Sequence, residues 1–205
     1  MAQNLDSKVR AKVWLTPHQV DDLRSACYST GADYLQQRNE ALIALMYDTG
    51  LRVGELVAVD VDMLREGNST LYVPTEIQKD YPNDNEPAPA TLELASDVTR
   101  LLSSYLNSRW KDSTALFPSR SSDRITTQGV RDAISKVADE AGVKPYLVDG
   151  TRGGPDDVTP HALRHSVAYR MMNAEEGNTL YDVRNRLRHR SIQTTEQVYD
   201  HIIRV

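Results

Sequence analysis

Four residues in the last quarter of the chain could together carry out chemistry on a phosphodiester. His161 and Arg164 lie three positions apart, so they share one face if their segment is helical. His189 and Tyr199 follow further along the chain. A histidine can transfer a proton, a tyrosine oxygen can attack phosphorus, and an arginine can neutralise phosphate charge. The set therefore predicts an active site for nucleophilic attack on a phosphodiester.

The first of these residues lies at a predicted helix N-terminus. Thr159 and Pro160 provide a cap and a first turn, so His161 would sit where free N–H groups favour an anion. His161 and His165 could instead bind a metal, because they are four residues apart. However, no Glu lies between them, and no cluster of carboxylates or cysteines completes a set of ligands. We therefore expect no metal at these histidines.

Two basic residues in the first half of the chain could serve the same site. Arg52 follows Gly50 at a predicted turn between helices and could direct its planar group toward phosphate. The alternative is a surface arginine paired with Glu55. Lys79 lies where a predicted strand ends and a long hairpin begins, so it could protonate a leaving oxygen. The alternative there is a solvated hairpin lysine.

Positive charge is concentrated around the second histidine. The chain has a net charge of −5, yet residues 151–205 carry eight basic and seven acidic residues against 16 and 22 in residues 1–150. Arg184, Arg186, Arg188 and Arg190 precede or flank His189. They could form a phosphate-positioning surface or simply a solvated helix face. A local basic surface can bind phosphate within an acidic protein, although with weaker long-range attraction.

The elements that must position these residues are mostly helices. Apolar spacing and capping residues predict helices at about 16–29, 38–49, 52–56, 97–109, 127–141, 159–173 and 179–187. Short apolar segments separated by turns predict a small three-stranded antiparallel sheet near residues 59–94. The expected fold class is α+β, mainly α-helical, with one substantial core. Residues 1–13 are expected to be a linker or a disordered N-terminus.

The composition also limits where the protein acts. Cys27 is the single cysteine, which excludes an internal disulfide and favours an intracellular compartment. The sequence lacks both an apolar run of roughly 18 residues and a signal-peptide pattern at the N-terminus. We therefore expect a soluble cytoplasmic protein. The preference for Arg (18) over Lys (6) and the acidic surplus hint at a salt-loving host.

Taken together, residues 14–204 resemble the catalytic domain of the tyrosine recombinase (phage integrase) family. Residues 49–56 resemble the family's first arginine box, and Lys79 falls on the expected strand hairpin. Residues 161–165 resemble its His-x-x-Arg box, and residues 187–189 its second histidine segment. Thr194-Thr195 then leads to Tyr199. The resemblance implies a catalytic domain at 14–205 with no core-binding domain before it, encoded by an archaeal or bacterial mobile element.

The resemblance also implies a role for each residue. Arg52 and Arg164 would clamp the scissile phosphate, and Tyr199 would attack it to form a 3′-phosphotyrosine. Lys79 would protonate the leaving 5′-oxygen, His161 would assist proton transfer, and His189 would hydrogen-bond a non-bridging oxygen. The covalent bond conserves energy, so neither ATP nor a metal is needed. The implied partner is double-stranded DNA and the implied function is site-specific recombination.

The chain departs from the family's common pattern at two places. Arg188 stands where glycine commonly precedes the second histidine, and the interval from Thr195 to Tyr199 is one residue longer. One residue rotates a helical side chain by about 100°. Only six residues follow Tyr199, so we expect a monomer in solution that assembles on DNA. The alternatives are a catalytically silent DNA-binding module or a type IB topoisomerase.

Overall fold

The computed structural model describes residues 13–78 and 86–199. The fold is mainly α-helical. In chain order, the α-helices are α2 (Pro17–Ala26), α3 (Asp33–Thr49), α4 (Val53–Ala58), α5 (Ser96–Ser108), α6 (Thr127–Ala141), α7 (Pro160–Tyr169), α8 (Leu180–Leu187) and α9 (Ile192–Tyr199). A π-helical segment, Arg170–Ala174, extends α7. Short 3₁₀ turns lie at Cys27–Ser29, Val61–Met63, Thr75–Ile77 and Pro155–Asp157.

The strands form two small antiparallel sheets. One has the order β2–β3–β4, and the other pairs β1 with β5. The strands are β1 (Val13–Trp14), β2 (Leu64–Arg65), β3 (Thr70–Val73), β4 (Ala90–Glu93) and β5 (Tyr146–Leu147). The three-stranded sheet lies within the predicted range 59–94. The prediction of a mainly helical α+β fold with this sheet is therefore confirmed.

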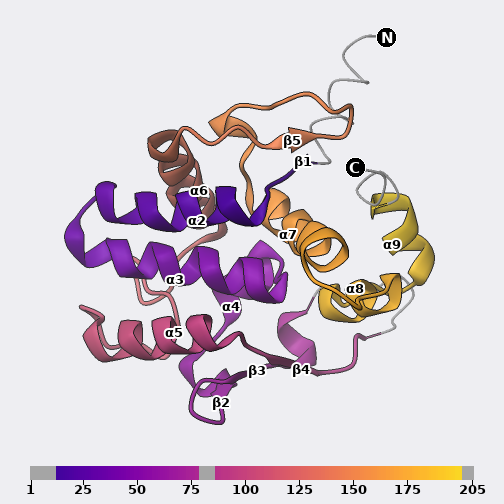
Figure 1. Ribbon diagram of the computed structural model, residues 1–205. Helices are drawn as coiled ribbons and strands as arrows, with labels where there is room; N and C mark the ends of the chain where they lie inside the picture. The colour runs from indigo at the N-terminus through magenta and orange to yellow at the C-terminus, as the bar shows by residue number, and fades with distance from the viewer. Residues whose placement is uncertain (1–12, 79–85, 200–205) are drawn as a thin grey trace.

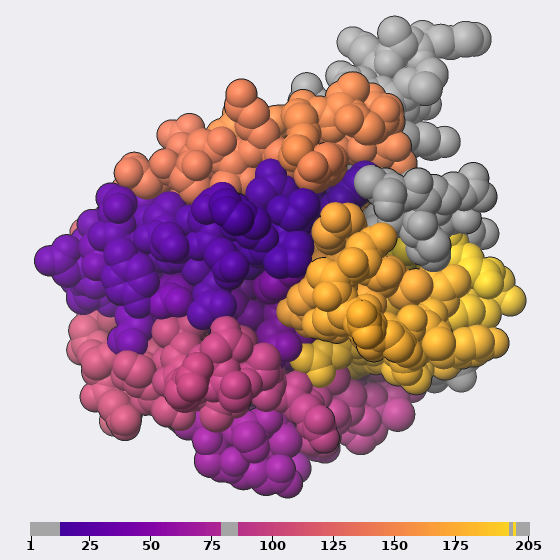
Figure 2. Space-filling model, in the orientation of Figure 1, coloured from indigo at the N-terminus to yellow at the C-terminus, as the bar shows by residue number. Residues whose placement is uncertain are grey.

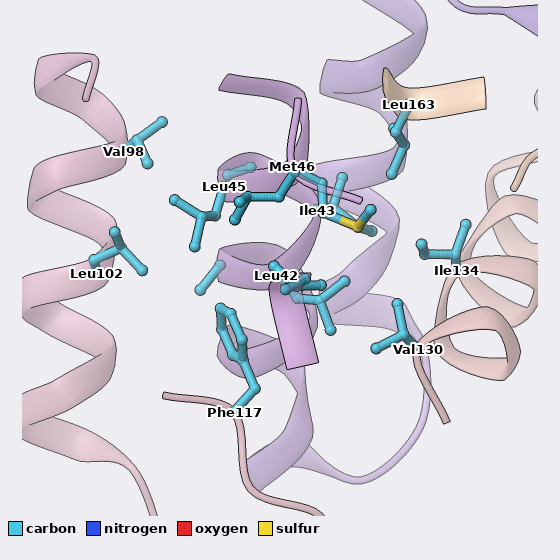
Figure 3. Close-up of a cluster of buried hydrophobic side chains, with 14 of the residues drawn as sticks. Leu42, Ile43, Leu45, Met46, Val98, Leu102, Phe117, Val130, Ile134 and Leu163 are labelled. Carbon is cyan, nitrogen blue, oxygen red and sulfur yellow. The ribbon is translucent and has the colours of Figure 1, made fainter. Parts of the chain in front are cut away.

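Helix α3 occupies the centre of the molecule. Every residue from Ala41 to Met46 is buried, so the apolar stripe predicted for this helix is in fact a fully covered segment. Its side chains lie between α5, with Val98 and Leu102, and α6, with Val130 and Ile134 (Figure 3). Helices α2, α3 and α5 lie one above another, with the β2–β3–β4 sheet at one end (Figure 1).

Capping explains where several helices begin. Thr16 accepts a hydrogen bond from the backbone N–H of Gln19 at 3.3 Å, and the Gln19 side chain accepts one from the backbone N–H of Thr16 at 3.0 Å. This capping box begins α2 where the sequence predicts it. Helix α3 begins at Asp33, five residues before the predicted start. No strong capping signal precedes it, because the N-cap residue is Ala32, whose side chain makes no capping hydrogen bond.

A second, smaller cluster joins both ends of the described chain. Trp14 of β1 stacks on Tyr146 of β5 at 5.9 Å and on Tyr169 of α7 at 6.3 Å, measured between ring centroids. Buried side chains of α7, α8 and α9, including Val183 and Tyr199, complete this cluster. The segment 160–199 forms one side of the surface, beside the N-terminal helices (Figure 2). The β1–β5 sheet was not predicted, because two-residue strands carry no periodicity.

In residues 13–78 and 86–199, no helix combines the length and apolar character needed to cross a membrane.

Candidate active site

Arg52 is positioned by a sharp turn between two helices. Helix α3 ends at Gly50, whose φ of 65° is left-handed, and Arg52 is the N-cap of α4. Its guanidinium donates to Oε1 of Glu55 at 2.8 Å, and its backbone N–H donates to Oε2 at 2.8 Å. The pairing weighed as the alternative therefore exists, but Glu55 is only 1% exposed. Arg52 is thus held by a buried carboxylate rather than by a surface contact.

Arg164 contacts the backbone of both the first arginine box and the second histidine segment. It is buried in α7, and its guanidinium donates to the carbonyl of Gly50 and to the carbonyl of Leu187. Gly50 lies in the first arginine box, residues 49–56, and Leu187 lies in the second histidine segment, residues 187–189. Burial lowers the pKa of Arg164, and the neighbouring Arg52 lowers it further. The guanidinium therefore lies where an incoming anion would relieve positive repulsion.

His161 and both arginines meet at one pocket. The cavity has a volume of about 310 Å³, and its lining consists of Arg52, Val53, Arg131, Thr159, Pro160, His161 and Arg164. Thr159 caps α7 by accepting from the N–H of Ala162 at 3.1 Å. His161 therefore stands in the first turn of α7, where the helix dipole favours an anion. The pocket combines the side chains of three arginines, Arg52, Arg131 and Arg164, with a helix N-terminus.

The imidazole of His161 stays neutral at the pocket wall. Desolvation lowers its pKa below the ordinary value, and the charges of Arg164 and Arg52 act in the same direction. The side chain remains open to solvent, so desolvation is partial. A neutral imidazole can accept a proton from an attacking hydroxyl.

His189 follows the end of α8 and is oriented by α9. Its Nδ1 lies 3.0 Å from the Oγ1 of Thr195, a buried residue. Its ring stacks on Tyr199 with centroids 5.9 Å apart and planes 10° apart. Burial lowers the pKa of His189 to about 3, and Arg164 and Arg52 contribute to the shift. His189 is therefore an uncharged hydrogen-bonding group at neutral pH.

Tyr199 lies between two histidine rings at the end of α9. It is 1% exposed and stacks on His189. Its ring is nearly perpendicular to that of His165, with the two ring centroids 5.5 Å apart. Burial raises its pKa to about 12, while Arg164 and Arg52 oppose that shift. The longer interval before Tyr199 does not turn the ring away from His189. The side chain packs beside the pocket and is not among the residues that line it.

Lys79 lies outside the described residues. The residue before it, Gln78, is buried, and its amide donates to the carbonyls of Val73 and Ala88 at 3.2 and 2.9 Å. Gln78 also lines a second pocket, which Arg52 borders. The connection between β3 and β4 therefore starts next to Arg52.

Two of the arginines around His189 are used inside the protein. Arg186 pairs with Asp48 at 2.7 Å, and Arg188 pairs with Glu55 at 2.6 Å. These two therefore stabilise the packing of α8 against α3 and α4, and they are not a surface for phosphate. Burial raises the pKa of Glu55, but Arg188 and Arg52 outweigh it, so its pKa lies below the ordinary value.

Sequence reasoning missed three residues of this site. Arg131 of α6 lines the pocket, but in the sequence it is one more arginine on an amphipathic helix. Glu55 entered only as a surface partner of Arg52. Arg188 entered as part of a basic run and as a departure from the family's common glycine, but without a partner in the site. Within 13–78 and 86–199, no group of three His, Cys, Asp or Glu side chains is arranged to hold a metal.

Comparison with known proteins gives the same family along nearly the whole chain. The model of the phage integrase family matches residues 13–204. A tyrosine recombinase XerC of Roseiflexus castenholzii is 33% identical over 189 residues, which are 92% of this chain and 54% of that relative. The chain thus spans about half the length of such relatives.

Solved structures share the fold. The crystal structure of the XerA recombinase superposes with a TM-score of 0.70 at 25% identity, covering 94% of this chain and 61% of that one. The Tn1549 transposon integrase in complex with transposon right end DNA gives a TM-score of 0.70 at 20% identity, covering 92% and 61%. The second likeness supports the fold alone.

Proposed function

Because the chain belongs to the phage integrase family, we propose that it cleaves and rejoins DNA strands at specific sites through a covalent tyrosine–DNA intermediate. The domain that does this is residues 14–205, with residues 1–13 leading into it. The in vivo reaction would be integration, excision or resolution.

The observation that carries this proposal is the convergence of Arg52, Arg164 and His161 on one pocket. Arg52 and Arg164 come from segments more than a hundred residues apart. Arg164 donates to the carbonyl of Gly50, two residues before Arg52, and this bond holds the two segments together. Two guanidinium groups beside a helix N-terminus match the charge of a phosphodiester. In the transition state the phosphate gains negative charge, so preorganised cations stabilise it more than they stabilise the substrate.

The nucleophile would be the hydroxyl oxygen of Tyr199. A bond forms between this oxygen and phosphorus while the bond from phosphorus to the 5′-oxygen breaks. The phenolic proton passes to the neutral imidazole of His161, and the leaving oxygen takes a proton from Lys79. Reversal by another strand's 5′-hydroxyl rejoins the DNA. Arg164 and Arg52 favour the phenolate, which offsets the effect of burial on Tyr199.

His189 would hydrogen-bond a non-bridging oxygen of the phosphate. Its Nδ1 is engaged by Thr195, so Nε2 is the nitrogen left to face the substrate. The reaction needs no metal and no nucleotide cofactor, because the phosphotyrosine bond retains the energy of the broken linkage.

The partner would be double-stranded DNA. The protein would be a monomer in solution and would assemble with further copies on the DNA site. Arg131 lines the pocket and is exposed to solvent, so it is suited to bind a backbone phosphate. We place the protein in the cytoplasm, where DNA of a bacterial or archaeal cell lies. The buried, unpaired thiol of Cys27 is consistent with a reducing compartment.

Covalent trapping tests the proposal. Incubation with a nicked suicide duplex is expected to give a protein–DNA adduct, because the released short strand diffuses away and prevents religation. Tyr199→Phe removes the nucleophilic oxygen and should abolish the adduct. Tyr181→Phe, at a residue 63% exposed on α8, is the matched control and should retain it.

Other outcomes would favour other functions. Duplex binding without any adduct would indicate a silent DNA-binding module. Relaxation of supercoils without exchange of strands would indicate a type IB topoisomerase. An adduct that persists in Tyr199→Phe would show that another residue is the nucleophile.

A further inference from the structure

Arg188 adopts a backbone conformation that glycine would adopt more easily. It ends α8 with φ 53° and ψ 49°, in the left-handed region. A residue with a Cβ pays about 1–2 kcal/mol for that conformation, and glycine pays almost nothing. Arg188 is also buried, which is costly for a charged group. Something in the folded protein must offset both costs.

The offset is an ion pair with Glu55. The guanidinium of Arg188 donates to Oε2 of Glu55 at 2.6 Å, and Glu55 in turn accepts from the guanidinium of Arg52 at Oε1. Glu55 thus joins an arginine that lines the phosphate pocket to an arginine that does not. Through this carboxylate, the end of α8 is connected to the start of α4.

The charge balance of this group depends on Arg188. The cations Arg52, Arg164 and Arg188 surround the single carboxylate of Glu55, which leaves two positive charges in excess. Without Arg188, the carboxylate would keep its ion pair with Arg52, and only one excess charge would remain. Because the group is largely buried, solvent would screen little of this change.

We propose that Arg188 is a positioning residue, which by pairing with Glu55 keeps the guanidinium of Arg52 oriented and its positive charge available to phosphate. This role rests on the proposed function of the same pocket. The carbonyl of Leu187, one residue before Arg188, accepts from Arg164, so the end of α8 also contacts an arginine of the pocket. A direct contact between Arg188 and phosphate is the competing explanation.

A rescue experiment separates the two explanations. The set is Arg188→Met, Glu55→Gln and the double variant, with Arg100→Met on the exposed face of α5 as control. The first readout is the single-turnover rate of adduct formation on the suicide duplex. The second is the affinity for inorganic phosphate, followed by the NMR resonance of the Arg52 Nε–H group.

Arg188→Met is expected to lower both the rate and the phosphate affinity by about tenfold, because Glu55 then neutralises Arg52. Glu55→Gln in that background removes the unbalanced carboxylate and should restore most of both. Arg100→Met should match the wild type. If Arg188 touched phosphate itself, Glu55→Gln would restore neither, and that result overturns the proposal.

Arg188→Gly distinguishes positioning from simple stability. Glycine relieves the left-handed strain, so the free energy of unfolding of this variant should be at least that of Arg188→Met. Its rate of adduct formation should be as low as that of Arg188→Met. A wild-type rate in Arg188→Gly would overturn the proposal. Absence of an adduct in the wild type would refute the proposed function, whereas the phosphate affinities would still decide the role of Arg188.

Discussion

At the scale of single residues, burial sets the protonation states around the pocket. Burial lowers the pKa of His189 to about 3 and raises that of Tyr199 to about 12, so both side chains are neutral at pH 7. The arginines add to the first shift and oppose the second. The site therefore holds uncharged groups for proton transfer and hydrogen bonding beside permanent cations, which suits chemistry on an anion.

The low pKa of His189 predicts how stability depends on pH. An unfolded histidine takes up a proton near pH 6.5, but folded His189 takes it up only near pH 3. The unfolded state binds more protons between these values, so the free energy of unfolding falls as the pH falls through this window. A loss of about 1 kcal/mol is expected from pH 6.5 to pH 5.5.

Denaturant unfolding at the two pH values measures this effect. In His189→Asn the loss between pH 6.5 and pH 5.5 should be clearly smaller than in the wild type. His18→Asn, at an exposed histidine on α2, is the matched control for the loss of a histidine side chain. An equal pH dependence in all three proteins would contradict the depressed pKa.

At the scale of elements, the turn between α3 and α4 needs glycine for two reasons. Gly50 has a φ of 65°, and a Cβ placed there would lie 2.3 Å from the Cδ2 of Leu187, which is itself buried. The close approach lets α8 pack on the end of α3. It also lets the carbonyl of Gly50 reach Arg164.

Gly50→Ala is therefore expected to be costly. Left-handed strain contributes about 1–2 kcal/mol and displacement of Leu187 about 1–3 kcal/mol, so the free energy of unfolding should fall by roughly 2–5 kcal/mol. Gly142→Ala is the matched control. Gly142 ends α6 with a φ of 59° and has nothing within 4 Å of the added Cβ, so only the strain applies. Equal losses in urea unfolding would show that the contact with Leu187 does not matter.

The cap of α7 links an element boundary to the site. Thr159→Ala removes the bond to the N–H of Ala162 and should cost about 1 kcal/mol of stability. Because Thr159 lines the pocket at the start of the His161 helix, adduct formation should also slow.

Thr16→Ala provides the comparison for this prediction. It removes the corresponding cap of α2, a helix that does not line the pocket. The free energy of unfolding should fall by a similar amount, and the rate of adduct formation should not change. A slowing of the same size in both variants would mean that Thr159 acts only through global stability.

At the scale of the whole molecule, the site lies where two apolar clusters meet. The large cluster centres on α3, and the small one holds α8 and α9 against α7 and β1. The arginine box thus depends on the large cluster, whereas Tyr199 belongs to the small one. Few buried side chains hold the small cluster, so α8 and α9 are expected to open first.

Hydrogen exchange can test this division. Val183→Ala in the small cluster and Val130→Ala in the large one remove the same atoms from fully buried positions. Val183→Ala should accelerate exchange in α8 and α9 and leave α3 slow, whereas Val130→Ala should accelerate α3 and α6. Uniform acceleration by both variants would show a single cooperative unit.

The sequence by itself determined the helices other than α9, the three-stranded sheet and the family. Capping residues, helical apolar spacing and short alternating strands are local signals, so they can be read without the fold. The candidate residues Arg52, His161, Arg164, His189 and Tyr199 also came from the sequence, because their types suit phosphodiester chemistry and their order resembles a known family.

Only the tertiary structure decided how these residues are held. Glu55 and Arg188 are 133 positions apart, and no local pattern reports a contact at that separation. Whether Tyr199 faces His189 depended on how α9 packs, which the longer interval left open. Burial was decisive as well, because it turns a surface-type ion pair into a coupled charge cluster and sets the pKa of each ring. These properties arise from the packing of distant segments, and they exist only once the chain has folded.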